Sequence, residues 1–452
     1  MSIGFIHKLL TVLALVGSTM AAFGQSGALR AGAGKVDISP TSDMFPMKDM
    51  QLYGSLHDPL YARALVLDNG RTKVAVVSLD AIHFPPDASD PLIKSVATEL
   101  NIPAANFIIS ATHDHNAPGV WNLPGANGKT PYFAIVQKGV LDAVRQANAN
   151  LQPARIGFGS GKAYINTNRD EKIGEGYHMG YDPEGPSDKT VAVMLVTSAT
   201  GKPIAVYTNY PVHSVVMYRA HTKDGQVQVS GDLGGWASKY VEEHLLGAVG
   251  LWTMGAAGDQ NPLFMANYNQ DGPDVLDEGP GGWAILDEEA RRVGEVIVRV
   301  AKNTQNMSNT AVLWGAQTSV TCPGQQRAEP PASGVPQQGW QAPAHVKMTD
   351  AEPVTIPLHL IMVNDIAIAG VSGEVFTEIG EHVKQDSAFD RTFMVTMLPN
   401  GIGYIPTDKA YLMPSEKAIT NRIKPGCAEP AIVGSFKQME QSYLPVWEAA
   451  QK

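Results

Sequence analysis

Stretches with helical periodicity alternate with short apolar runs along most of this 452-residue chain. The apolar runs read as buried strands, and the helical stretches between them repeat their apolar residues every three to four positions. Such alternation is typical of α/β proteins, in which helices cover sheets. We therefore predict an α/β fold of mixed β-sheets layered with helices. The helical stretches are Pro91 to Leu100, Tyr132 to Ala149, Gly234 to Leu246 and Glu288 to Asn303.

Two shorter features predict local structure. The turn formers Asp68, Asn69 and Gly70 separate two β-rich runs, which indicates a hairpin that enters a sheet. The segment from Cys322 to Thr349 is rich in Pro, Gln, Gly and Ala and has no periodicity, so it predicts a long surface loop. Strand-like runs resume after this segment, so we do not expect it to divide two domains.

The N-terminus predicts export from the cell. His7 and Lys8 precede an apolar stretch, and small residues follow where a signal peptidase would cut before Gln25. We expect residues 1–24 to be a signal peptide and residues 25–452 to form a single secreted or periplasmic domain. The leader is too short to remain as a membrane helix, and no later segment is apolar enough to span a bilayer.

Charge and cysteine content exclude some functions. The formal net charge of -10, without any basic block, provides nothing to neutralise a phosphate backbone, so we expect no nucleic-acid partner. Cys322 and Cys427 are the only cysteines, and an exported chain allows them to pair, but the sequence leaves the pairing open. Neither cysteine has a histidine base beside it, which argues against a thiol nucleophile.

Polar side chains follow the ends of five strand-like runs. Because the carboxyl ends of strands in α/β sheets converge on one rim, residues that are far apart in the sequence can meet there. We therefore predict a metal site at the carboxyl-end rim of the strands. The candidates are His113 and His115 after FIIS, His213 after PIAVYTNYPV, Asp259 and Asn261 after GLWTMGAAG, Glu374 after IAIAGVSG, and Tyr404 after FMVTMLPNGIG.

The residue types in this set suit one kind of metal. Two histidines and a carboxylate are a common ligand set for a divalent ion, and a tyrosine oxygen can supply a fourth ligand. Such a nitrogen-rich set fits Zn²⁺ best. A catalytic zinc ion acidifies a water molecule and polarises a carbonyl or phosphoryl oxygen, so the predicted chemistry is hydrolysis.

Each feature has a simpler explanation when it is taken alone. The H-x-H pair can be a surface pair, and His213 can be a satisfied core histidine. Glu374 can cap a helix that starts at Val375, and Tyr404 can be an ordinary aromatic residue of a sheet. The segment GAAGDQNP can be only a turn. The repetition of a strand followed by a ligand is what favours a site.

Many motifs in a fixed order carry a family resemblance. They are AGAGKVDISP, HDPLYARALVL, ATHDHNAPG, NRDEK, DPEGPSDKTVAVM, NYPVHSVV, SGDLGGWA, GAAGDQNP, SGEVFTEIG and GYIPTDKAY. Through them, from about Ala31 to about Val433, the chain resembles the N-terminal catalytic domain of the neutral/alkaline non-lysosomal ceramidase family, especially its shorter bacterial members.

The resemblance implies roles for individual residues. It implies that zinc is held by His113, His213, Glu374 and Tyr404, the same set that the strand ends indicate. His115 then lies near the metal as a proton shuttle or oxyanion partner. The motif Asn168-Arg169 resembles the family's basic substrate contact, and a surface charge is the alternative for Arg169. We expect Arg169 and Asn261 to hold the developing oxyanion, and we include Asp259 among the catalytic candidates.

The chain also departs from the family pattern. Ceramidases carry a serine in G-D-V-S-P where this chain has Asn261, and their T-H-S-G-P-G pattern is replaced by one that contains Asp114 and the bulkier Asn116. A further family tyrosine falls on Glu416. We also expect the family's C-terminal immunoglobulin-like domain to be missing. These departures argue against a long-chain sphingolipid substrate.

The sequence leaves three functional hypotheses. The leading one is a secreted, zinc-dependent hydrolase that cleaves an N-acyl amide bond in a ceramide-like or other small-molecule or lipid-like substrate. A second is a non-catalytic relative that binds metal and carbohydrate or lipid, which the missing serine motivates. A third is a metal-dependent esterase, because esters and amides pass through the same tetrahedral oxyanion. The oligomeric state stays open.

Overall fold

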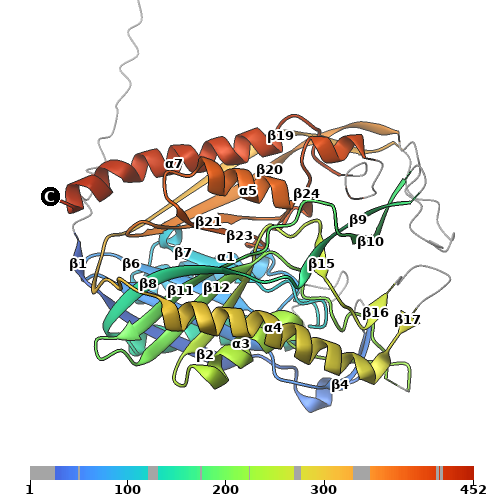
Figure 1. Cartoon of the computed structure of the whole chain (residues 1–452), viewed down its shortest axis with the longest axis horizontal. Coiled ribbons are helices and arrows are strands. Elements are labelled where there is room, and N and C mark those ends of the chain that lie inside the picture. Colours follow the sequence, from blue (N-terminus) through green and yellow to red (C-terminus); the bar gives the residue numbers. More distant parts are fainter. Residues whose placement is uncertain are drawn as a thin grey trace, which may run out of the picture.

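The computed structural model describes residues 26–48, 51–120, 131–173, 176–222, 224–268, 276–328, 347–413, 417 and 421–452. Its main elements form four layers: helices, an eight-stranded sheet, a four-stranded sheet and helices again. In Figure 1, α7 and α5 lie above the two sheets, and α3 and α4 lie below them. The prediction of a mixed α/β fold in which sheets are layered with helices is confirmed.

The larger sheet contains the strands that precede His113 and His213. Its order is β14-β12-β11-β8-β2-β5-β6-β7, and its pairs are antiparallel except β12 with β14 and β6 with β7. The predicted hairpin around Asn69 is confirmed as the β5–β6 pair. The strands are β2 Arg30–Asp37, β5 Tyr61–Asp68, β6 Lys73–Leu79, β7 Phe107–Ala111, β8 Gln152–Lys162, β11 Thr190–Ser198, β12 Pro203–Tyr210 and β14 Val249–Met254.

All four predicted helices are present and cover one face of this sheet. The apolar stripes of α1 and α2 pack with one half of the sheet, and those of α3 and α4 pack with the other half. All four begin before their predicted starts: α2 and α3 by only one or two residues, whereas α1 takes Pro86 rather than Pro91 as its first proline and α4 extends upstream to Gly282. The bounds are α1 Pro86–Leu100, α2 Pro131–Ala149, α3 Asp232–His244 and α4 Gly282–Asn303.

The smaller sheet lies against the other face of the larger one. Its order is β19-β20-β21-β23, and apolar residues such as Ile361, Ile368 and Phe393 pack against Leu65 and Tyr207 of the larger sheet. The outer face of the smaller sheet is covered by α5 and α7. The bounds are β19 Leu313–Arg327, β20 Met348–Val363, β21 Ile366–Val371, β23 Arg391–Val395, α5 Thr377–Asp386 and α7 Ala428–Ala450.

The prediction of a loop from Cys322 to Thr349 is wrong at both of its ends. Strand β19 continues to Arg327 and β20 begins at Met348, and these two residues are paired. The end of this ribbon reaches beyond the core, so its side chains are mostly exposed and do not alternate between polar and apolar types, which hid the strands in the sequence. Residues 329–346 lie outside the described part of the chain.

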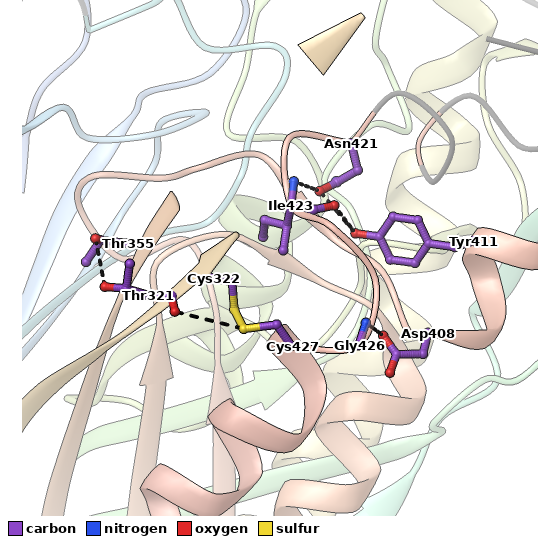
Figure 2. The surroundings of a disulfide bond; sticks show 9 residues. All are labelled: Thr321, Cys322, Thr355, Asp408, Tyr411, Asn421, Ile423, Gly426 and Cys427. Atoms are coloured by element: carbon purple, nitrogen blue, oxygen red, sulfur yellow. Dashed lines mark hydrogen bonds between the residues drawn. A yellow bond between two sulfur atoms is a disulfide. The ribbon is translucent and has the colours of Figure 1, made fainter. Parts of the chain in front are cut away.

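A disulfide bond between Cys322 and Cys427 joins β19 to the N-cap residue of α7, and it resolves the pairing that the sequence left open. The two Cα atoms are 5.7 Å apart and 105 positions separate the residues in the chain. Figure 2 shows the bond where the segment around Ile423 lies against β19.

Short elements complete the described chain. The strands are β1 Gly27–Ala28, β3 Met47–Lys48, β4 Leu52–Leu56, β9 Asn166–Ile173, β10 Gly176–Asp182, β13 Val227–Val229, β15 Gln260–Pro262, β16 Asn267–Tyr268, β17 Leu276–Asp277, β18 Thr310–Ala311, β22 Glu374–Val375 and β24 Tyr404–Ile405. The 3₁₀ turns are η1 Ser42–Met44, η2 Ala104–Asn106, η3 Gly279–Gly281 and η4 Lys409–Leu412. Among the described residues, no helix combines the length and apolarity that a membrane crossing needs. The predicted signal peptide lies outside the described residues.

Candidate metal centre

His113 occupies a strained position directly after β7. Its φ angle is +57°, in the left-handed region that side chains other than glycine seldom adopt. Its Nδ1 atom lies 2.8 Å from the carbonyl oxygen of Ile82. Because a carbonyl oxygen only accepts, Nδ1 carries a hydrogen, and Nε2 is the ring nitrogen left for a ligand.

His213 is prepared in the same way at the end of another strand. It follows β12 closely and is fully buried, and its Nδ1 atom donates to the carbonyl oxygen of Gln260 at 2.9 Å. Burial, with a further contribution from the positive charge of Arg169, lowers the pKa of His213 to about 3. The ring is therefore neutral near pH 7, and its Nε2 lone pair is directed into the site.

Glu374 brings a carboxylate to these two nitrogens. Its Oε2 atom lies 3.4 Å from Nε2 of His113 and 3.2 Å from Nε2 of His213. Burial alone raises the pKa of Glu374, but the two adjacent imidazoles outweigh it and hold the pKa well below its usual range. Glu374 belongs to β22 and does not cap a helix, since α5 begins at Thr377 with Phe376 as its N-cap residue.

His115 completes a group of three imidazoles. Its Nε2 atom lies 3.1 Å from Nε2 of His113, and ligand atoms of His113, His115 and His213 all lie within 4.8 Å of one another. The ring of His115 is only partly buried, and within the described residues its Nδ1 atom has no hydrogen-bond partner. His115 is therefore less firmly fixed than the other two histidines.

The chemistry of this donor set fits a divalent cation. The Nε2 atoms of His113 and His213 both lie against Oε2 of Glu374, at 3.4 and 3.2 Å. A cation bound by both nitrogens and by Glu374 would take the place of the proton that a contact between an imidazole nitrogen and a carboxylate otherwise needs, and nitrogen-rich sets of this kind favour zinc. The side chain of His115 lies close enough to join the same ion.

Tyr404 lies beside Glu374 because β22 and β24 pair in parallel with these two residues in register. Its hydroxyl oxygen accepts a hydrogen bond from Nη2 of Arg169 at 3.0 Å. Burial raises the pKa of Tyr404 above its ordinary value despite the neighbouring guanidinium, so the phenol is neutral in the absence of a metal ion at its oxygen.

Arg169 and Asn261 lie next to Tyr404. Buried Arg169 donates from Nη1 to the side-chain oxygen of Asn261 at 3.0 Å and from Nη2 to the carbonyl oxygen of Gly258 at 2.7 Å. Strand β9 carries Arg169 and pairs with β15, which carries Asn261. The amide oxygen of Asn261 is occupied by the guanidinium, so its NH₂ group is the part that can donate to a substrate.

Asp259 and Asn168 lie in the same region but are engaged with the protein itself. The Oδ1 atom of Asp259 accepts from the backbone N–H and the hydroxyl of Thr377 at 2.9 and 2.8 Å. Its Oδ2 atom accepts from the amide of Asn168 at 3.0 Å. Burial raises the pKa of Asp259 to about 6. These contacts hold the start of α5 against β9, so Asp259 positions these two elements.

Asp114 faces away from the two histidines that flank it. Its Oδ1 atom accepts from the backbone N–H of Asn116 at 2.8 Å, and the side chain is fully buried. Its Oδ2 atom has no hydrogen-bond partner among the described residues, so Asp114 does not hold a ring nitrogen of either histidine.

Several residues near the site carried no readable signal in the sequence. The carbonyl groups of Ile82 and Gln260 orient the histidine rings, and any residue type could supply a carbonyl. Tyr218 stacks edge-on against His115 with ring centroids 5.1 Å apart. Buried Lys417 contacts Asp170 at 3.3 Å and lies 5.8 Å from the ring centre of Tyr404. Glu416, the counterpart of the family's further tyrosine, lies outside the described residues.

Comparisons with known proteins identify the family of the chain. Residues 30–271, more than half of the chain, match the family described as "Neutral/alkaline non-lysosomal ceramidase, N-terminal". The neutral ceramidase of Pseudomonas aeruginosa is 26% identical over 262 residues, which cover 52% of this chain and 37% of that protein. The neutral ceramidase of Mycobacterium tuberculosis is 24% identical over 265 residues, which cover 54% and 39%.

Solved structures extend the likeness to nearly the whole fold. A structure described as "Ceramidase complexed with C2" matches with a TM-score of 0.70 and 17% identity, covering 92% of this chain and 75% of that one. The crystal structure of the neutral ceramidase from Pseudomonas aeruginosa matches with a TM-score of 0.67 and 17% identity, covering 91% and 73%. The matched sequence spans less than two fifths of each curated relative. On the family match, this chain belongs to the neutral/alkaline non-lysosomal ceramidase family.

Proposed function

We propose that this protein is a zinc-dependent hydrolase that cleaves an N-acyl amide bond. The observation that carries the proposal is the convergence of the Nε2 atoms of His113 and His213 on the carboxylate of Glu374, with the Nδ1 atom of each ring held by a backbone carbonyl. These three residues and Tyr404 would hold the ion. Zinc bound there would acidify a water molecule and polarise the scissile carbonyl group.

The residues around the ligands would complete the chemistry. Arg169 supplies a fixed positive charge beside Tyr404, and the NH₂ group of Asn261 can donate to the carbonyl oxygen as negative charge develops on it. His115 is neutral near pH 7, because burial and the neighbouring histidines hold its pKa well below the usual range. Its incompletely fixed ring suits it to accept a proton from attacking water and to return that proton to the leaving nitrogen.

The substrate class rests on the family. The curated relatives are named neutral ceramidases, and we infer that the bond cleaved here is likewise an amide between an acyl group and an amine. The position of the family serine is taken by Asn261, which cannot act as a nucleophile but can donate hydrogen bonds. A hydrolase that activates water does not need that serine, so its loss is compatible with catalysis and would change which head group is accepted.

We also propose that the protein acts outside the cytoplasm. The predicted leader over residues 1–24 motivates this location, and the disulfide between Cys322 and Cys427 supports it, because such bonds persist mainly in oxidising compartments. Fractionation of cells that express the full chain, with N-terminal sequencing of the exported form, tests both points. A mature protein that retains residues 1–24 in the cytoplasm contradicts them.

The function is tested by metal analysis together with a substrate panel. We expect about one zinc ion per chain, and hydrolysis of N-acyl amides that is lost on chelation and returns with zinc. His113→Ala and His213→Ala should lose both metal and activity. Exposed His382, which pairs with Glu429 on the surface, provides a matched His382→Ala control that should keep both. Protein that binds no metal, or that binds zinc but cleaves only esters or nothing in the panel, contradicts the proposal.

A further inference from the structure

Tyr404 is fixed from two sides of a very short strand. On one side, the carbonyl oxygens of Gly403 and Ile405 accept from the backbone N–H groups of Glu374 and Phe376 at 2.9 and 3.0 Å. Carbonyl groups alternate in direction along a strand, so the carbonyl of Tyr404 points to the other side. There it accepts a hydrogen bond from the side-chain amide of Asn421 at 2.7 Å.

The chain that leads into Tyr404 has little stiffness of its own. Asn400 and Gly403 have φ angles of +68° and +85°, and Gly401 lies between them. Glycine allows many backbone conformations, so such a segment does not by itself determine where the following residue lies. The contacts on the two sides of β24 must therefore determine it.

Asn421 can act as a support because it is itself fixed. It is 8% exposed, and its Oδ1 atom accepts from the backbone N–H of Ile423 at 2.9 Å. This contact sets the orientation of the amide, since only the NH₂ group is left to meet the carbonyl of Tyr404. The backbone carbonyls of Asn421 and Ile423 both accept from Nε2 of Gln325, at 2.9 and 3.1 Å.

The segment around Ile423 is in turn attached to β19. The backbone of Gln325 donates to the carbonyl of Arg422 at 2.8 Å, and that of Lys424 donates to the carbonyl of Pro323 at 2.9 Å. The disulfide then joins Cys427, three residues beyond Lys424, to Cys322 of β19 (Figure 2). A continuous set of bonds therefore runs from the smaller sheet through Asn421 to the backbone of Tyr404.

We propose that Asn421 is a positioning residue that holds Tyr404 at the metal centre, and that the Cys322–Cys427 disulfide supports it. This inference rests on the proposed function, because it takes Tyr404 to be a zinc ligand. Residues that hold a metal ligand in place without touching the metal typically contribute about 10- to 100-fold to metal affinity. Asn421 would act on the metal centre only through Tyr404.

The variant Asn421→Asp removes the hydrogen-bond donor that meets the carbonyl of Tyr404 but keeps the acceptor on the same side chain. The carboxylate still accepts from Ile423, but when ionised it cannot donate to the carbonyl of Tyr404. We expect zinc affinity, measured by competition with a chelator, to fall about 10- to 100-fold. Asn364→Asp is the matched control, since Asn364 also accepts from a backbone N–H and donates to a backbone carbonyl, far from the metal centre. It should leave zinc affinity unchanged.

A double-mutant cycle with Tyr404→Phe separates positioning from general loosening of the fold. If Asn421 acts through Tyr404, Asn421→Asp should weaken zinc binding in the wild-type background and add nothing in the Tyr404→Phe background. Cys322→Ala/Cys427→Ala should follow the same pattern with a smaller effect, and it remains informative if Asn421→Asp does not fold. Equal losses in both backgrounds overturn the inference alone. Unchanged zinc affinity in Tyr404→Phe contradicts the proposed ligand set and the inference with it.

Discussion

The Oε2 atom of Glu374 lies 3.2 Å from the Nε2 atom of His213, although 161 positions separate the two residues in the chain. The contact joins the two sheets of the fold, because Glu374 follows a strand of the smaller sheet and His213 follows a strand of the larger one. Since the Nδ1 atom of His213 is held by a backbone carbonyl, Nε2 is the nitrogen directed at the carboxylate, and a cation between the two atoms would bind both of them.

Glu374→Gln tests the need for that cation. The amide keeps the shape of the side chain but removes its charge and one oxygen ligand, so we expect zinc affinity to fall by more than about 100-fold, beyond the effect of an indirect contact. Activity should fall in parallel at limiting zinc. Glu378→Gln serves as the control, because Glu378 forms an ion pair with exposed Lys409 at 3.6 Å and no other side-chain bond within the described residues. Isothermal titration with zinc would contradict the ligand assignment if the two variants bound the ion equally.

Arg169→Lys tests whether the guanidinium beside Tyr404 takes part in the reaction. The planar guanidinium donates hydrogen bonds to Asn261, Gly258 and Tyr404 at the same time, and an ammonium group cannot match that geometry. We expect kcat/KM to fall about 100-fold, as for the loss of an oxyanion donor, while bound zinc stays near one per chain. Arg145→Lys, at an exposed cluster with Glu99 and Asp142, should be neutral. Unchanged kinetics in Arg169→Lys would place Arg169 outside the reaction.

Much of this site could be predicted because its signals are local. A strand followed by a ligand is visible in the sequence at His113, His213 and Glu374, and parallel strand ends meet for reasons of topology. The simpler explanation for Glu374, a helix cap, fails because two residues separate it from α5. What the sequence did not reveal is non-local. The carbonyls that orient the rings, the position of Lys417 and the support from Asn421 depend on which loops the tertiary fold brings together.

The ribbon formed by β19 and β20 shows the same limit for the fold. The inner half, near Leu313 and Val363, contains apolar residues that the sequence makes recognisable, whereas in the outer half only Cys322 and Gly324 of β19 are buried and the residues from Gln325 to Arg327 are polar and partly or fully exposed. Periodicity reports burial on one face, so a strand without a buried face leaves no pattern in the sequence.

Removal of the disulfide should lower the stability of the whole domain. The bond closes a loop of 105 positions, and in the chain-entropy model a loop of about that length stabilises the folded state by up to about 5 kcal/mol. We expect Cys322→Ala/Cys427→Ala to lower the free energy of unfolding by about 2–5 kcal/mol in urea denaturation at saturating zinc. Wild-type protein reduced before denaturation provides the comparison. A double variant as stable as the oxidised protein contradicts this prediction.

His359 should make stability depend on pH in a predictable direction. This buried ring donates from Nε2 to the carbonyl of Ala105 at 2.8 Å and accepts from Gln317 at 3.3 Å, and burial lowers its pKa to about 4. In the unfolded chain its pKa is about 6.5. Between these values the unfolded state binds the extra proton, so stability is present above about pH 6.5 and is lost as the pH falls towards 4.

The variant His359→Gln removes this titration, although it also loses packing at every pH. The stability advantage of the wild type over the variant should therefore shrink by about 2 kcal/mol between pH 7 and pH 5. Urea denaturation of both proteins at the two pH values measures the difference, and other titrating groups cancel because they are common to both. Parallel pH profiles would mean that His359 takes up a proton in the folded state as readily as in the unfolded chain, which its burial on β20 against η2 opposes.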